Sequence, residues 1–331
     1  MLLPSTNIKS IVVTGGAGFI GSHLIQHLLT KYPNYLIFNI DSLTYASDLN
    51  NCEKFNDKNN YQLIKCDINN KNKLEDVFKK ITPYGVFHLA AESHVDNSIA
   101  NPNLFIETNV LGTLNLLNLS LKYSVKRFLQ VSTDEVYGSL SLNDEPSNEE
   151  SPYKPRSPYS ASKASSDHLV QSFFNTYGLN TVLTNCSNNF GPNQHNEKLI
   201  PTIIKSLVNK TNIPIYGDGE NVRDWLYVKD HCEALDIVFH NGKSGEKYNI
   251  GGDNELTNMD LVKKICKLYD NMKNNNKDST KLIKFIKDRA GHDFRYSINH
   301  NKITSELGWL PGVSFDMPLL STIKHYIKKY E

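Results

Sequence analysis

The stretch IVVTGGAGFIG, residues 11–21, joins a short apolar run to the glycine pattern GxxGxxG. An apolar run bounded by glycine is typical of a buried strand, and the residues from Ile20 to Leu29 repeat with helical spacing. Glycine at Gly15, Gly18 and Gly21 allows a tight turn and lets the backbone approach a pyrophosphate at the start of the helix. The stretch therefore predicts the first strand–turn–helix unit of a dinucleotide-binding fold.

Strand and helix patterns alternate along the first half of the chain. Further buried strands are predicted at Tyr35–Ile40, Tyr61–Cys66, Gly85–Ala90, Arg127–Ser132 and Thr181–Cys186, and helices at Leu74–Lys80, Val110–Lys122 and Ser160–Tyr177. Repeated strand–helix units with buried strands predict an α/β protein built on a doubly wound parallel Rossmann sheet. We expect residues 1–187 to form this cofactor-binding domain.

The pattern changes after residue 187. Glycine, proline and aromatic residues separate shorter elements, as in Ile213–Asp224 and Gly308–Gly312, which predicts a smaller, irregular substrate-binding lobe over residues 188–331. Tyr227–His240 indicates a strand and a helix that return to the first domain, within a return segment of about residues 227–250, so the two domains should interleave. Asn271–Thr280, rich in Asn and Lys, is expected to be a loop.

Composition limits the partners. Lys and Arg number 36 against 35 Asp and Glu, so a net charge of +1 provides no general attraction for nucleic acid or an anionic membrane. Five widely spaced cysteines without a CxxC pair argue against disulfides or a zinc site and predict reduced, buried thiols. Met1–Ser10 lacks a signal-peptide core, and no apolar run approaches the roughly 20 residues that span a bilayer. We expect a cytoplasmic protein without a metal.

Two acidic residues follow predicted strands at the same edge of the sheet. Asp41 ends the second strand, 20 residues after Gly21. A carboxylate there accepts hydrogen bonds from a ribose diol and repels a 2′-phosphate, and no arginine follows it directly, so NAD is expected rather than NADP. Asp67 follows the third strand and is expected to line the adenine end of the cofactor site. A helix N-cap is the alternative role for Asp67.

Tyr159 and Lys163 form a YxxxK pattern at the start of a predicted helix. Residues four apart share a helix face, so the phenol and the ammonium can point into one site. The charge of Lys163 should lower the pKa of Tyr159, and a bound nicotinamide cation should lower it further. Tyr159 is therefore the candidate base for a substrate hydroxyl that is being oxidised.

Taken together, the motifs resemble those of the extended short-chain dehydrogenase/reductase superfamily along nearly the whole chain. The most specific stretches are HLAAESHVD (88–96), STDEVYG (132–138), SPYSASK (157–163), NNFGP (188–192), EKLIP (197–201), NVRDW (221–225) and GHDFRY (291–296). The closest resemblance is to the family of dTDP-glucose 4,6-dehydratases. The family of UDP-glucose 4,6-dehydratases is an alternative, because thymine and uracil differ by a single methyl group. Phe190 and Lys229 stand where this family usually has Tyr and Glu, and neither change removes a group that the chemistry needs.

The adjacent acids Asp134 and Glu135 separate the candidate activities. Related epimerases usually have small or hydroxyl residues at these positions, and related decarboxylases a single acid at the second. Elimination of water across carbons 5 and 6 of a hexose needs both an acid and a base, which two carboxyl groups can supply. Because strand residues alternate between faces, the strand should already turn here if both face the ligand. Burial and repulsion would then keep one carboxyl protonated. The alternative is a helix N-cap followed by a solvated glutamate.

The resemblance implies a redox-neutral conversion of a nucleotide-linked glucose to its 4-keto-6-deoxy form. Tyr159 would deprotonate the carbon 4 hydroxyl, with Thr133 bonded to the same oxygen, while NAD accepts a hydride that later returns to carbon 6. Glu135 would remove the carbon 5 proton, and Asp134 would protonate the departing carbon 6 hydroxyl. A 4-epimerase and a non-catalytic cofactor-binding homologue are the rival readings. The superfamily resemblance also implies a homodimer joined through the Val110–Lys122 and Ser160–Tyr177 helices.

The resemblance further implies which residues contact each ligand. The expected cofactor contacts are Gly15, Gly18, Phe19, Ile20, Gly21, Asp41, Asp67, Ile68, Leu89, Ala91, Thr108, Tyr159, Lys163 and Asn189. The expected contacts of the nucleotide-sugar substrate are Ser93, Asn188, Lys198, Leu199, Tyr216, Arg223, Asn258, Arg289 and His292. Arg223, in a loop bordered by Gly217, Gly219 and Trp225, should bind the diphosphate, with Lys198 and Arg289 nearby. A solvated surface charge is the alternative for these three residues.

Overall fold

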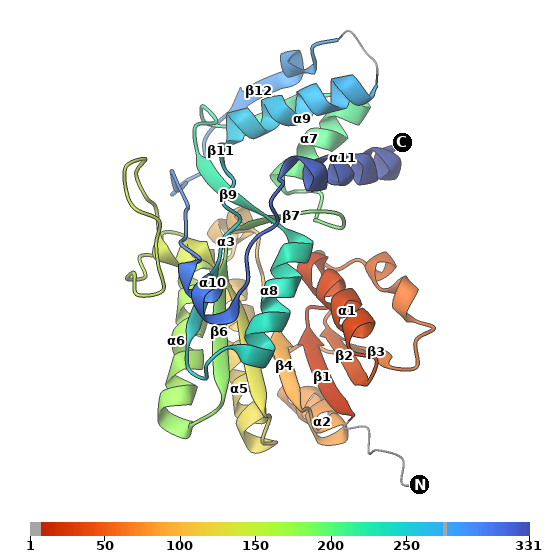
Figure 1. Ribbon diagram of the computed structural model, residues 1–331, viewed down its shortest axis with the longest axis vertical. Coiled ribbons are helices and arrows are strands. Elements are labelled where there is room, and N and C mark those ends of the chain that lie inside the picture. The colour runs from red at the N-terminus through yellow and green to blue at the C-terminus, as the bar shows by residue number, and fades with distance from the viewer. Residues whose placement is uncertain (1–7, 274–276) are drawn as a thin grey trace.

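A parallel seven-stranded sheet forms the centre of the computed structural model, which describes residues 8–273 and 277–331 (Figure 1). Its strand order is β10-β6-β5-β4-β1-β2-β3, and every neighbouring pair is parallel. The strands are β1 (Lys9–Thr14), β2 (Tyr35–Asp41), β3 (Tyr61–Lys65), β4 (Gly85–His88), β5 (Arg127–Thr133), β6 (Thr181–Cys186) and β10 (Lys247–Ile250). The order reverses between β1 and β4, which opens a crevice at their carboxyl ends. The predicted doubly wound α/β fold is confirmed.

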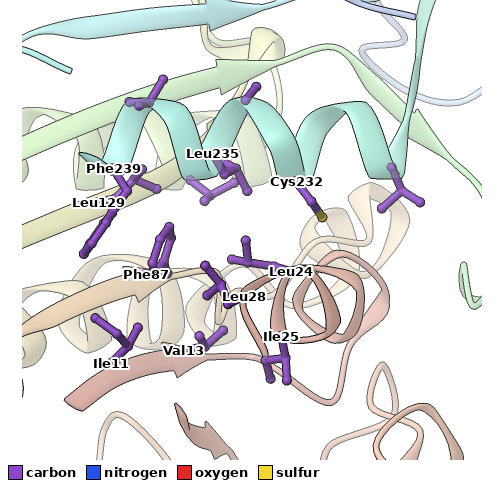
Figure 2. Close-up of a cluster of buried hydrophobic side chains, with 14 of the residues drawn as sticks. Ile11, Val13, Leu24, Ile25, Leu28, Phe87, Leu129, Cys232, Leu235 and Phe239 are labelled. Atoms are coloured by element: carbon purple, nitrogen blue, oxygen red, sulfur yellow. The ribbon is translucent and has the colours of Figure 1, made fainter. Parts of the chain in front are cut away.

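Helices cover both faces of this sheet, and successive strand residues divide between the two resulting cores. On one face, α1 (Phe19–Lys31) and α8 (Val228–Asn241) pack against each other and against the sheet, in one apolar cluster with Ile11 and Val13 of β1 (Figure 2). On the other face, Val12 joins a second cluster with residues of α2 (Lys71–Ile81), α5 (Gly112–Lys122) and α6 (Pro158–Tyr177). Because both faces are covered, the strands are apolar at consecutive positions.

The chain builds a second apolar core above the carboxyl edge of the sheet (Figure 1). This lobe contains α7 (Leu199–Asn209), α9 (Asn258–Met272), α11 (Asp316–Tyr330), a sheet of β11 (Glu255–Thr257), β9 (Val222–Tyr227) and β7 (Asn188–Phe190), and a pair of β12 (Ile283–Ile286) and β8 (Ile213–Tyr216). The shorter helical segments are η1 (Leu49–Asn51), η2 (Glu53–Phe55), α3 (Val95–Ala100), α4 (Pro102–Phe105), η3 (Ile106–Leu111), η4 (Asp134–Tyr137), η5 (Ser279–Leu282) and α10 (Asn301–Leu307). Within the described residues, no helix is both long and apolar enough to cross a bilayer.

Three predicted elements differ from the structure. Val110 and Leu111 belong to the π-helical segment η3, which precedes α5. The predicted strand at Ala90 ends at His88, because the amides of Leu89 and Ala90 turn to the Thr14 hydroxyl, each at 3.1 Å. The strand before α8 is β9, which pairs outside the central sheet, and β10 is the strand that returns. Both α8 and β10 lie within the predicted return segment of about residues 227–250, but the strand follows the helix instead of preceding it. Apolar pattern reveals a strand but not its partner.

Two predictions meet residues that the structure leaves undescribed. Within the expected loop Asn271–Thr280, α9 continues to Met272 and η5 begins at Ser279, while residues 274–276 lie outside the described residues. Residues 1–7 of the N-terminal stretch also lie outside them. All five cysteines are buried and free, as predicted. The division into domains at residue 187 stays a prediction.

Candidate active site

The glycine-rich turn between β1 and α1 borders a cavity at the carboxyl edge of the sheet. Gly15 has a φ of 70°, and a Cβ there would lie 2.8 Å from the Ala90 nitrogen; a Cβ on Gly21 would lie 2.2 Å from the Gly15 oxygen. Gly18 caps α1 without any side-chain hydrogen bond, which leaves the first helical amides available to an anion. The close approach requires glycine, and the turn fits a pyrophosphate group.

All the residues predicted to contact the cofactor line this cavity. Asp41 is buried there, and its carboxylate accepts hydrogen bonds from the Ala17 amide at 2.9 Å, the Leu43 amide at 2.8 Å and the Ser47 hydroxyl at 2.7 Å. A carboxylate offers about four acceptor positions, so one is left for a ribose hydroxyl. Asn70, not Asp67, caps α2, so the N-cap alternative for Asp67 is wrong. The cavity therefore fits NAD.

Tyr159 and Lys163 enter the cavity from the first turns of α6. Ser157 and Ser160 form a capping box and Pro158 is the first helical residue, which fixes the start of α6 immediately before Tyr159. The Lys163 ammonium donates to the Val131 carbonyl at 2.8 Å. Burial, followed by the negative charge of Glu135, raises the pKa of Tyr159 well above its usual value. We expected the charge of Lys163 to lower the pKa of Tyr159. That prediction is wrong for the net effect of all the protein groups around Tyr159.

The two acids Asp134 and Glu135 lie where β5 ends and the 3-10 turn η4 begins. This turn breaks the strand alternation, and both side chains line the cavity that contains Tyr159 and Lys163, as expected. Thr133 is the cap of the turn, because its hydroxyl accepts from the Glu135 amide at 3.3 Å. The alternative in which Asp134 is only an N-cap is therefore wrong.

Asp134 and Glu135 differ in their electrostatic surroundings. Asp134 is 3% exposed, and its Oδ2 has no hydrogen-bond partner among the described residues. Burial, with the negative charges of Glu135 and Asp224, raises the pKa of Asp134 well above its usual range. Burial also raises the pKa of Glu135, but the positive charges of Lys198 and Arg223 oppose that rise. The geometry thus favours a protonated Asp134 beside a more readily ionised Glu135.

A second cavity continues from the first into the upper lobe, and Glu135, Asn188 and Lys198 border both. Every predicted substrate contact lines one or both of these cavities: Ser93, Asn188, Lys198, Leu199, Tyr216, Arg223, Asn258, Arg289 and His292. The Lys198 ammonium donates to the Ser93 carbonyl at 3.2 Å, which holds it at the junction. The cavities together form a continuous path from the glycine-rich turn to the upper lobe.

Arg223 is a strand residue of β9, not the loop residue that we expected. Its guanidinium donates to the carbonyls of Val222 at 2.7 Å and Asp293 at 2.9 Å, and it lies 4.3 Å from the ring centroid of Tyr296. At 7% exposure it is no solvated surface charge. These contacts hold a buried cation against the second cavity, where it suits a diphosphate.

Arg289 approaches the same cavity from the other side. Its Nε and Nη2 lie 2.6 and 3.0 Å from the two carboxylate oxygens of Asp96, and its guanidinium stacks 5.0 Å from the ring centroid of Tyr216. Asp96, Asp293 and Tyr296 also line the cavity but were given no role from sequence. All three stand inside the motifs HLAAESHVD and GHDFRY, which was the signal that could have indicated them.

Comparisons with known proteins agree with this site. A family model described as GDP-mannose 4,6 dehydratase matches residues 12–321. The dTDP-glucose 4,6-dehydratase of Haemophilus influenzae is 46% identical to this chain, over 97% of the chain and 98% of that protein. The corresponding Escherichia coli enzyme is 45% identical, over 97% of the chain and 94% of that protein. The chain belongs to the dTDP-glucose 4,6-dehydratase family. The prediction made from the sequence motifs is confirmed.

Solved structures of other proteins have nearly the same fold as this member of the dTDP-glucose 4,6-dehydratase family. A crystal structure of the Bacillus anthracis dTDP-glucose 4,6-dehydratase in complex with NAD has a TM-score of 0.88 and 45% identity, covering 97% of each chain. A UDP-glucose 4-epimerase from Thermotoga maritima, with UDP-glucose, has a TM-score of 0.87 and 30% identity, covering 97% of this chain and 100% of that one. The overall fold alone therefore does not separate dehydratase from epimerase.

Arg223→Lys should raise the KM for nucleotide sugar roughly tenfold with a smaller change in kcat, because lysine keeps the charge but loses the planar fork that binds a diphosphate. Arg127→Lys is the matched control, since Arg127 also holds backbone carbonyls, those of Phe239 and Gly242, but lines neither cavity. Steady-state kinetics and thermal unfolding measure both variants. An unchanged KM for Arg223→Lys would place this arginine outside substrate binding.

Proposed function

We propose that this chain is an NAD-dependent hydro-lyase that converts dTDP-glucose to dTDP-4-keto-6-deoxyglucose and water. The observation that carries the proposal is the turn at the end of β5, which brings Asp134 and Glu135 into one cavity with Tyr159. Family membership supports the reaction class, and relatives solved with NAD support the cofactor. We choose thymine as the nucleobase of the substrate because the relatives are named for dTDP-glucose. UDP-glucose is the competing substrate.

Each side chain has a defined part in this reaction. Bound NAD supplies the acceptor for a hydride from carbon 4 and its return to carbon 6. Tyr159 takes the proton of the carbon 4 hydroxyl, and the Thr133 hydroxyl bonds the same oxygen. Tyr159 can take this proton only as the phenolate, which its raised pKa disfavours, and the positive charge of the nearby Lys163 ammonium would favour that phenolate. Oxidation at carbon 4 then makes the carbon 5 proton acidic.

The elimination step divides between the two acids. Glu135, whose carboxylate is favoured by Lys198 and Arg223, removes the carbon 5 proton. Asp134, which burial keeps protonated, donates its proton to the carbon 6 hydroxyl as that group leaves as water. Arg223 favours the charged form of both acids, whereas Lys198 acts on Glu135, which supports this order and agrees with the roles that the family resemblance implies. An epimerase needs neither proton transfer, so it would gain nothing from this buried and mutually repelling pair.

The purified protein should turn over dTDP-glucose without added cofactor or reductant, and kcat/KM for dTDP-glucose should exceed that for UDP-glucose. The first expectation follows because the reaction consumes no net reducing equivalents. Product mass and the absorbance of the 4-keto sugar in alkali measure turnover of both substrates. A requirement for stoichiometric NADH would contradict the redox-neutral reaction. A preference for UDP-glucose would keep the dehydratase chemistry but change its substrate.

Asp134→Asn and Glu135→Gln should each slow overall turnover by about 10²- to 10⁴-fold, the usual effect of losing a general acid or base. Neither residue acts in oxidation at carbon 4, so both variants should still reduce bound NAD in a single turnover. The absorbance of reduced nicotinamide measures this step. In heavy water, Glu135→Gln should stop deuterium exchange at carbon 5, whereas Asp134→Asn should retain some exchange.

Tyr159→Phe is the control for this pair, because it should abolish the reduction of NAD itself while leaving substrate binding intact. If both acid variants also fail to reduce NAD, the two carboxyl groups shape the site rather than carry out elimination. If both turn over normally, an epimerase becomes the better assignment. These outcomes separate the acid and base roles from a general loss of structure.

We also propose that the enzyme is a cytoplasmic homodimer. Free, buried thiols suit a reducing compartment. Exposed apolar side chains occur on η3, α5 and α6, where Leu111 is 48%, Leu121 38% and Tyr177 57% exposed. A second copy of the chain would cover these side chains, which agrees with the helices expected from the superfamily.

Leu111→Glu should convert the dimer to a monomer, because a charge would be buried in the interface. Leu142→Glu, at a still more exposed leucine outside this surface, should leave the dimer intact. Light scattering after size-exclusion chromatography gives the mass of each variant. A monomeric parent protein would contradict the proposal, as would an intact dimer in Leu111→Glu.

A further inference from the structure

Two loops from different parts of the chain meet at the cofactor cavity. The first, residues 42–48, follows β2 and contributes Ser42, Thr44, Ala46 and Ser47 to the cavity wall. The second, residues 191–198, follows β7 in the upper lobe and contributes Gln194, His195 and Lys198. The sequence pattern assigned no role to the first loop beyond Asp41, which precedes it. Together the two loops form part of the cavity wall.

The two loops touch through a pair of aromatic rings. The rings of Tyr45 and His195 lie edge to face, with centroids 5.7 Å apart and an interplanar angle of 90°. This is the preferred geometry of an aromatic pair, which places the positive ring edge against the negative ring face. Tyr45 also faces the buried carboxyl of Glu92, whose charge, together with burial, raises the pKa of Tyr45 to about 12. One tyrosine therefore connects the wall that follows β4 with the upper lobe.

The base of the second loop is anchored to both lobes. The His23 ring on α1 lies 2.9 Å from the Pro192 carbonyl, and the Gln194 side chain donates to the Asn189 carbonyl at 2.8 Å. From α11, the hydroxyl of Tyr326 donates to the Gln194 carbonyl at 2.7 Å. These contacts leave little freedom near residues 191–194. They hold His195 in position opposite the first loop.

The first loop is anchored in the same manner, to the glycine-rich turn. The Asp48 amide donates to the Ala17 carbonyl at 3.1 Å, and the Ser47 hydroxyl donates to Asp41. Each loop also contains a non-glycine residue with a left-handed backbone, Leu43 with φ 58° and Asn193 with φ 70°. Such conformations cost free energy and persist where the surrounding contacts enforce them, commonly at functional sites. Both loops are therefore held in shapes that present Tyr45 and His195 to each other.

We propose that Tyr45 and His195 form a clasp that retains the cofactor between the two halves of the reaction. The inference rests on the proposed function. In a redox-neutral dehydration, the hydride taken from carbon 4 must return to carbon 6 of the same sugar. Loss of reduced cofactor after the first step would strand an oxidised sugar and an enzyme unable to finish. A contact that must open before the cofactor leaves lowers the rate of that loss.

The Tyr45–His195 pair is suited to control opening without controlling the fold. Tyr45 is 43% exposed, and neither ring belongs to the buried hydrophobic clusters of the described residues. Contacts of this kind have small effects on global unfolding and larger effects on local opening. Variants at these positions should therefore fold normally, and their effect should appear in the rate at which NAD dissociates.

Tyr45→Ala and His195→Ala should each raise the dissociation rate of NAD about three- to tenfold, the range expected for loss of one aromatic pair. The double variant should release NAD no faster than either single variant, because both remove the same contact. Tyr45→Phe keeps the ring and should behave like the parent. Tyr84→Ala is the matched control, since Tyr84 has a similar exposure of 36% but belongs to neither loop. Exchange of bound NAD for radiolabelled NAD measures the rate, and thermal unfolding checks the fold.

During turnover, the alanine variants should also lose activity progressively and recover it when NAD is added, as NADH escapes from unfinished cycles. The clasp is ruled out if the single variants release NAD at the parent rate, if the double variant shows the product of both effects, or if Tyr45→Phe matches Tyr45→Ala. A parent protein that binds no NAD would instead overturn the proposed function. The two failures are therefore distinguishable.

Discussion

Three acidic groups, the carboxyls of Asp134 and Glu135 and the phenol of Tyr159, share one cavity, and water is largely excluded from all three. Each has a raised pKa, because burial disfavours its charged form and the neighbouring negative charges add to that cost. For the two carboxyls, cations from separate elements oppose this cost: Lys198 just before α7, Arg223 from β9, and Arg289. The positions of these elements are thus tied to the chemistry of the acids.

The part of the cavity wall that follows β4 depends on a chain of buried hydrogen bonds. The Thr14 hydroxyl lies 2.7 Å from Nδ1 of His88, and Nε2 of His88 lies 2.9 Å from the Thr113 hydroxyl, which donates to the Asn109 carbonyl. Burial lowers the pKa of His88 to about 3, so the ring is neutral and can donate at one nitrogen while accepting at the other. The network fixes the end of β4 and the Leu89–Ser93 segment that lines the cavity.

The upper lobe supplies what the Rossmann sheet lacks, which is a set of cations for an anionic substrate. Arg223 is held by backbone carbonyls and Arg289 by the carboxylate of Asp96, so the two guanidiniums are fixed by different means. The hydrogen-bond acceptors of Arg223 are neutral carbonyls, whereas those of Arg289 are the carboxylate oxygens of Asp96. The two guanidiniums line the same cavity, so they can bind an anionic substrate group together.

The amino-acid sequence by itself determined the strands and helices of the first domain, to within three residues at most ends. It also determined the glycine-rich turn, the YxxxK pair and the turn at Asp134, because each depends on local periodicity or on groups a few residues apart. Every residue that the family resemblance gave as a ligand contact lines one of the two cavities, and what each binds stays a prediction. The local sequence favours these conformations without contacts from the rest of the chain.

Tertiary structure decided what depends on distant groups. It placed β10 rather than β9 in the central sheet, since strand pairing depends on contacts that local pattern does not contain. It put Arg223 on a strand against the carbonyl of Asp293, and it brought Tyr45 to His195 across 150 residues of sequence. The pKa of Tyr159 was wrongly expected to be lowered, because burial and the charge of Glu135 arise only when the chain folds. A pKa sums the field of every nearby group, and that sum exists only in three dimensions.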